Sequence, residues 1–124
     1  AVVLARVSHA KLLSIDTSEA EKMPGVEKVI TYKDVKGNNR INWPMQHARG
    51  IGDGMERPIL CEDMIYRYGD IIAIVDARTR EEARAAAKKV KFEYEQLPEY
   101  LDILDAMAPD AHQIHKNFPC RNMY

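Results

Sequence analysis

The sequence predicts an α+β fold in which two main helices pack on a small mixed sheet. Residues 71–75 form the most apolar run, and its length of five suits a buried central strand better than a helix. Residues 12–30 and 71–94 each read as a strand, a polar cap, a helix and a strand. With 124 residues, 46% of them hydrophobic and 30% charged, the chain suits one globular domain.

The first half of the chain is predicted to hold three strands. Residues 2–7 and 11–15 are rich in apolar and β-branched side chains, and residues 26–31 alternate loosely. Residues 32–35 are expected to form one helical turn.

A short helix is predicted between the second and third of these strands. Asp16 is expected to cap it by accepting from the amide of Glu19, three positions on. Pro24 cannot continue a helix and Gly25 tolerates left-handed backbone angles, so the helix should end there.

Residues 36–57 lack sustained periodicity and hold four of the six glycines. So long an irregular stretch is unusual inside a compact domain and is commonly functional or disordered. Trp43, the only tryptophan, lies in it. It is expected either to be partly exposed in a free domain or to anchor an interface in a larger protein.

The second half begins with short elements: a strand over residues 64–66 and a turn over residues 68–70. After the central strand, residues 79–82 match a capping box. Four small or apolar residues then share one helix face: Ala83, Ala86, Ala87 and Val90.

Residues 90–95 alternate strictly between apolar and polar side chains, so they predict a strand with one buried face. Residues 101–107 are expected to form a short helix capped by Asp102.

Composition argues against a nucleic-acid or membrane partner. The net charge is −1. Basic residues gather in one segment, but Glu81 and Glu82 lie among them, which favours a solvated helix face. These basic residues are Arg78, Arg80, Arg84, Lys88 and Lys89. No apolar run approaches the ~20 residues that span a bilayer. The two cysteines, Cys61 and Cys120, are far apart in sequence, which fits a reducing cytoplasm.

Two motifs could bind a ligand, and neither is complete. Residues 50–54 are glycine-rich, but Met55 stands where a dinucleotide fingerprint needs glycine, so a flexible loop is the preferred interpretation. His112, His115 and Cys120 could contribute to a zinc site, yet a fourth ligand is missing.

No catalytic group stands out either. Cys61 is next to Glu62 and Asp63, which should raise its thiol pKa, the wrong direction for a nucleophile. His9 and His47 have no partner nearby in the sequence. The sequence therefore predicts no catalytic, cofactor-binding or metal-binding residue. It suits a scaffold or interaction role.

Three groups of residues, in this order, resemble a known family. The first comprises residues 8–11, 14–20, 23–26 and 29–31. The second comprises residues 58–60 and 68–75, and the third runs from residue 83 to residue 98 with an ending of the Tyr-Glu-x-Leu-Pro type. Together they resemble the α/β-hammerhead domain of the xanthine dehydrogenase and aldehyde oxidase family of molybdenum hydroxylases.

Two positions depart from the family pattern. The family often has a proline between the residues equivalent to Ser8 and His9, and a Gly-Gln pair where this chain has Gly69 and Asp70. In appearance the chain is closest to the bacterial aldehyde oxidoreductases.

The resemblance implies a hammerhead domain over residues 1–108 and an extended tail over residues 109–124 that leads to a molybdenum-binding domain. It implies a cytoplasmic, homodimeric parent enzyme that oxidises aldehydes or N-heterocycles. That enzyme would use a molybdopterin-type molybdenum cofactor, two [2Fe–2S] clusters and in some members FAD. This chain, an excised piece expected to be inactive, would contact the remaining domains. A stand-alone ligand-binding or adaptor module is the alternative.

Overall fold

The α+β class is confirmed by the structure, a computed structural model that describes residues 1–41, 57–114 and 122. The chain forms two compact units. Unit 1 comprises residues 1–39 and 59–97, and unit 2 comprises residues 40–58 and 98–124.

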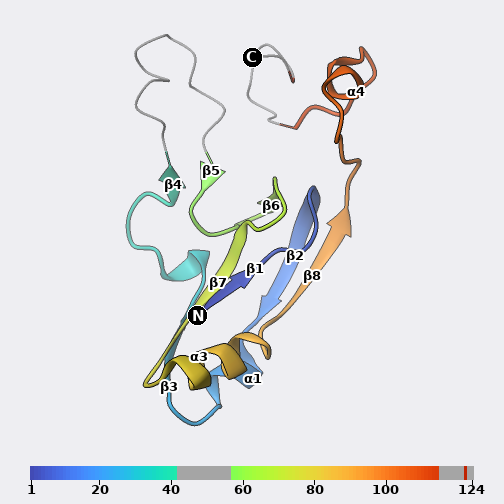
Figure 1. Cartoon of the computed structure of the whole chain (residues 1–124). Coiled ribbons are helices and arrows are strands. Elements are labelled where there is room, and N and C mark those ends of the chain that lie inside the picture. Colours follow the sequence, from blue (N-terminus) through green and yellow to red (C-terminus); the bar gives the residue numbers. More distant parts are fainter. Residues whose placement is uncertain (42–56, 115–121, 123–124) are drawn as a thin grey trace. The chain divides into compact units, whose positions relative to one another are not determined.

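Unit 1 contains two three-stranded sheets, and every ladder in them is antiparallel (Figure 1). In order across the first sheet, the strands are β1 (Val2–Leu4), β7 (Ile71–Ala77) and β3 (Val26–Ile30). In order across the second sheet, they are β6 (Met64–Ile65), β2 (Ala10–Asp16) and β8 (Lys91–Gln96).

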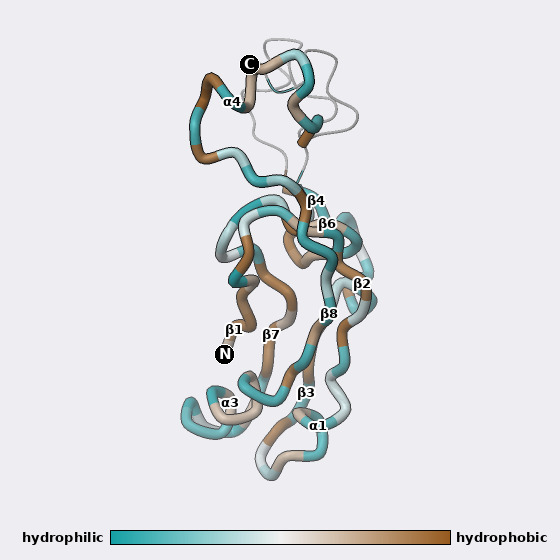
Figure 2. The backbone as a smooth tube through the Cα atoms, turned by 90° about the vertical axis from the view of Figure 1, so that its right-hand side faces the viewer, coloured by the Kyte–Doolittle hydropathy of each residue, from teal (hydrophilic) through white to brown (hydrophobic). Residues whose placement is uncertain are grey.

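The strands are thus divided between two sheets rather than joined in the one mixed sheet that the sequence suggested. Each predicted strand–helix–strand unit crosses from one sheet to the other, because β2 pairs with β8 and β3 pairs with β7. The linking helices, α1 (Ser18–Glu21) and α3 (Arg80–Ala87), lie side by side at one end of the sheets (Figures 1 and 2).

The predicted capping box of α3 is confirmed. The Glu82 amide donates to Thr79 Oγ1 at 3.2 Å, and the Thr79 amide donates to Glu82 Oε2 at 3.0 Å. Ala83 and Ala86 are buried, so small side chains let this helix lie close to the sheet.

The predicted cap of α1 is wrong. Asp16 remains extended as the last residue of β2, paired with Lys91 of β8, so the N-cap position falls to Thr17. Asp16 Oδ1 instead accepts from the Ser18 amide at 3.0 Å. The helix ends before Gly25, which adopts the predicted positive φ of 80°.

The core of unit 1 lies around β7, the brown central strand of Figure 2. Ile72 and Val75 on this strand, and Ile65 on β6, are almost completely buried. The buried face predicted for residues 90–95 is only partly observed, since Val90 is buried whereas Phe92 is half-buried and Tyr94 is 44% exposed. Both rings line an open groove, and Phe92 also packs against the edge of the core.

One buried amide joins the two parts of unit 1 that flank residues 40–58. Asn39 donates to the Leu60 carbonyl at 2.8 Å and accepts from the Leu60 amide at 3.0 Å. It also donates to Glu62 Oε1 at 2.8 Å. The helical turn predicted after β3 is present as η1 (Tyr32–Asp34).

Unit 2 contains a two-stranded ladder, β4 (Arg40–Ile41) with β5 (Arg57–Pro58), and the helix α4 (Ile103–Met107). Within the predicted irregular loop over residues 36–57, residues 40–41 and residue 57 therefore belong to strands, whereas residues 36–39 are irregular as predicted. Asp102 caps α4 as predicted, accepting from the Leu104 amide at 2.7 Å. None of the helices in the described part of the chain has the length and apolar character needed to cross a bilayer.

Candidate functional site

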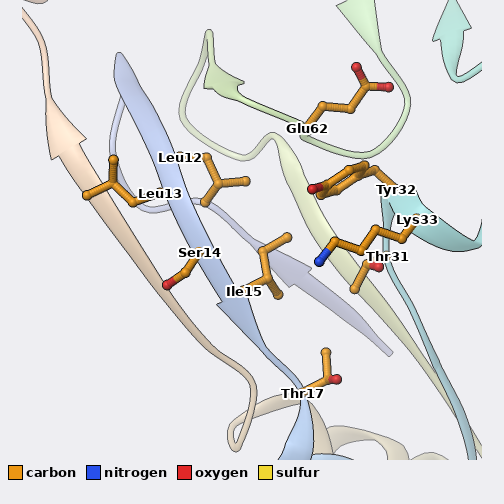
Figure 3. A pocket seen from close by; sticks show the side chains of 9 residues that line it. All are labelled: Leu12, Leu13, Ser14, Ile15, Thr17, Thr31, Tyr32, Lys33 and Glu62. Carbon is orange, nitrogen blue, oxygen red and sulfur yellow. The ribbon is translucent and has the colours of Figure 1, made fainter.

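A cavity of about 250 Å³ lies in unit 1 between β2 and the segment after β3 (Figure 3). A β-bulge between Leu12 and Ser14 shifts the register of β2 against β8. As a result, Leu12 and Ile15 both point toward Tyr32, whereas Leu13 and Ser14 point toward β8 (Figure 3). Leu12 and Ile15 therefore give the cavity an apolar lining on the side of β2.

The rim of this cavity is polar. The lining residues include the polar residues Thr31, Lys33 and Glu62. Glu62 is held by the Asn39 amide, and Lys33 Nζ lies 5.8 Å from the centroid of the Tyr32 ring. These groups could bind a small polar molecule, but they do not form a nucleophile–base pair.

Asp34 follows the cavity residue Lys33 in the sequence, and its carboxyl makes the stability of the fold fall at acid pH. The Thr31 amide donates to Asp34 at 2.9 Å and Lys28 pairs with it at 2.9 Å, and both lower the pKa of this carboxyl. Because the folded state lowers this pKa, the ionised carboxyl stabilises the fold at pH values above the ordinary value of 3.8. This stabilisation is lost as the pH falls through the pKa of the folded state. We expect Asp34→Asn to flatten the fall in urea midpoint between about pH 4 and pH 2.

Exposed Asp76→Asn on β7 is the matched control and should keep the wild-type pH dependence. An unchanged pH dependence in Asp34→Asn would contradict the role given to this carboxyl.

A second, larger space in unit 1 is a groove of about 480 Å³ between β1, α3 and β8. Its apolar lining includes Val2, Leu4, Phe92 and Tyr94. The Phe92 and Tyr94 ring centroids are 5.9 Å apart. We name this space the β1–β8 groove.

Three cations stand at the edge of the β1–β8 groove: Arg6, Arg84 and Lys88. The sequence predicted a solvated helix face for the basic residues between positions 78 and 89, and a strand with one buried face over residues 90–95. The groove was missed because both patterns describe single elements, whereas the groove forms where three elements meet.

Cys61 is buried, and its thiol is poorly suited to chemistry. Burial, followed by the nearby Asp70 and Asp63 carboxylates, raises its pKa to about 12. The predicted direction is confirmed, although burial rather than charge is the main cause.

We expect Cys61 to resist thiol reagents at pH 8, because almost none of it is thiolate and reagent access is closed. Labelling by Ellman's reagent should be complete only after addition of urea. The measurement uses Cys120→Ser so that one thiol remains, and rapid labelling without urea would contradict the buried position.

Of the other candidate residues, His9 and His112 are among those that the structure describes. His9 is buried at the entry to β2, and the His112 amide donates to Tyr100 Oη at 2.6 Å in unit 2. Within residues 1–41, 57–114 and 122, no three His, Cys, Asp or Glu side chains are placed to hold a metal ion. The remaining candidates lie outside the described residues: Trp43, His47, residues 50–54, His115 and Cys120.

Comparison with known proteins decides the family. A family model described as "Aldehyde oxidase and xanthine dehydrogenase, a/b hammerhead domain" matches residues 1–98. The chain belongs to this family. The resemblance carried by the three ordered groups of residues is thereby confirmed, and so is the hammerhead fold.

Relatives within the aldehyde oxidase and xanthine dehydrogenase family are much longer than this chain. Aldehyde oxidoreductase of Megalodesulfovibrio gigas is 52% identical over all 124 residues, which cover 14% of that protein. The crystal structure of the aldehyde oxidoreductase from Desulfovibrio desulfuricans aligns with a TM-score of 0.84 at 56% identity, covering 96% of this chain and 13% of that one. The nicotinate dehydrogenase large molybdopterin subunit of Eubacterium barkeri is 33% identical over 88% of this chain and 24% of its own length.

Proposed function

We propose that this chain is the hammerhead domain of a molybdenum hydroxylase that oxidises aldehydes or N-heterocycles. The observation that carries the proposal is the 52% identity, over all 124 residues of this chain, to one part of an aldehyde oxidoreductase. A molybdopterin-type cofactor is part of the proposal because one relative is named a large molybdopterin subunit. Two [2Fe–2S] clusters, FAD in some members and a cytoplasmic homodimer complete it.

Within that enzyme we assign this chain a structural role as an inter-domain scaffold. The proposed domain runs over residues 1–108, and residues 109–124 lead to the molybdenum-binding domain. The chemistry of its buried cysteine supports a structural role and not a cluster-binding role for this chain. Iron–sulfur clusters bind cysteine as thiolate, which does not fit Cys61, a buried thiol with a pKa of about 12.

The test compares the 124-residue chain with the complete polypeptide encoded by its reading frame. We expect the complete polypeptide to contain molybdenum and iron by elemental analysis and to reduce a dye with an aldehyde as electron donor. The 124-residue chain should show neither metal nor turnover. Stoichiometric molybdenum in the 124-residue chain, or a complete polypeptide without molybdenum, would overturn the proposal.

A further inference from the structure

The β1–β8 groove presents apolar side chains that unit 1 does not cover. Val2 is 49% exposed, Leu4 is 46% exposed and Tyr94 is 44% exposed. Large apolar residues scattered singly on a surface are ordinary, but these three line one groove together with Phe92. A contiguous apolar patch of this kind marks an interaction surface.

The strand pattern shows that this apolar face is additional to the core. Val3 and Ala5 point into unit 1 and are buried, so the alternation of β1 places Val2, Leu4 and Arg6 on the opposite face. The core of unit 1 does not need apolar residues on that outer face. We therefore infer that Val2 and Leu4 contact something outside the unit.

The charges at the edge of the groove point to the nature of that contact. Arg84 lies in the last turn of α3 and Lys88 is its C-cap residue, four positions further on, so their like charges repel. In the described part of the chain, no ion pair joins Arg6, Arg84 or Lys88 to a carboxylate. Carboxylates supplied by a partner would relieve this repulsion.

We propose that the β1–β8 groove receives a segment from another domain of the same long polypeptide, with apolar side chains flanked by aspartate or glutamate. This inference rests on the proposed function. The chain covers only 13–14% of its aldehyde oxidoreductase relatives, so most of their length is available to supply such a segment. A second copy docking groove to groove would instead bring the two sets of cations together.

Hydroxyl-radical footprinting of Tyr94 tests the occupant. Oxidation of Tyr94 is measured in the 124-residue chain and in the complete polypeptide, each relative to the same protein in urea. We expect Tyr94 to be oxidised about tenfold more slowly in the complete polypeptide, because a packed interface excludes water. Equal rates in the two proteins would overturn the proposal.

Protection that grows with the concentration of the 124-residue chain would identify a second copy as the occupant and would also overturn it. The molybdenum content of the same sample separates the two claims. If molybdenum is present while Tyr94 stays reactive, only the docking proposal fails. A complete polypeptide without molybdenum would refute the proposed function.

Charge reversal tests the acidic character of the segment. In the complete polypeptide, the double variant Arg84→Glu/Lys88→Glu should restore Tyr94 oxidation to the rate of the 124-residue chain. Arg80→Glu is the matched control, because Arg80 lies one turn earlier on the same helix and does not line the groove. Continued protection in the double variant would overturn the assignment of an acidic partner.

Discussion

Replacing Ile72 with alanine is expected to lower the free energy of unfolding by about 2–5 kcal/mol, the largest effect of any single substitution considered. Ile72 is 0% exposed on β7, the central strand of the first sheet. Truncation removes buried methyl groups and leaves a cavity, because the ladders with β1 and β3 on both sides restrict collapse of the backbone. Urea denaturation of the 124-residue chain, followed by circular dichroism, measures the change.

Leu13→Ala is the matched control, since Leu13 is 55% exposed on β2. It should change stability by less than about 1 kcal/mol, because surface substitutions rarely do more. Similar losses in the two variants would contradict the assignment of β7 to the core.

Replacing Gly25 with alanine is expected to cost about 2–3 kcal/mol through two effects that act together. Gly25 has a φ of 80°, which L side chains rarely adopt, and a Cβ there would overlap the carboxyl group of Glu82. Displacing that carboxyl would remove the two hydrogen bonds that it accepts from Thr79 at the start of α3.

Two other glycines separate these effects. Gly69 has a φ of 90° but no neighbour within 4 Å of an added Cβ, so Gly69→Ala should cost about 1 kcal/mol from conformation alone. Gly37 has neither constraint, and Gly37→Ala should be close to neutral. We expect the urea midpoint to be highest for Gly37→Ala, lower for Gly69→Ala and lowest for Gly25→Ala. A Gly25→Ala variant as stable as Gly69→Ala would show that Glu82 moves away without loss.

Features set by neighbouring residues were predicted well. The capping box at Thr79 depends on groups three positions apart, and the strand at residues 71–75 on a run of apolar residues, so both are visible in the sequence. The same holds for the helical turn after β3 and for the cap of α4 by Asp102.

Features set by distant pairing were not predictable. Asp16 matches a helix cap locally, but its ladder partner Lys91 keeps it extended. The division into two sheets depends on which strand each edge meets, and a hydrophobic pattern does not encode that choice. The exposed face of β8 was assigned to the core because alternation shows that a face is apolar but not what covers it.

The antiparallel pairing of β2 with β8 has a consequence for synthesis on the ribosome. The Ser14 hydroxyl donates to Glu93 across this pair, although the two residues are 79 positions apart. Because the ribosome adds about 5–20 residues per second, β8 is synthesised several seconds after β2, the strand with which it pairs. Until β8 emerges, the apolar side of β2 is available to chaperones, and the sheet of β6, β2 and β8 cannot be completed.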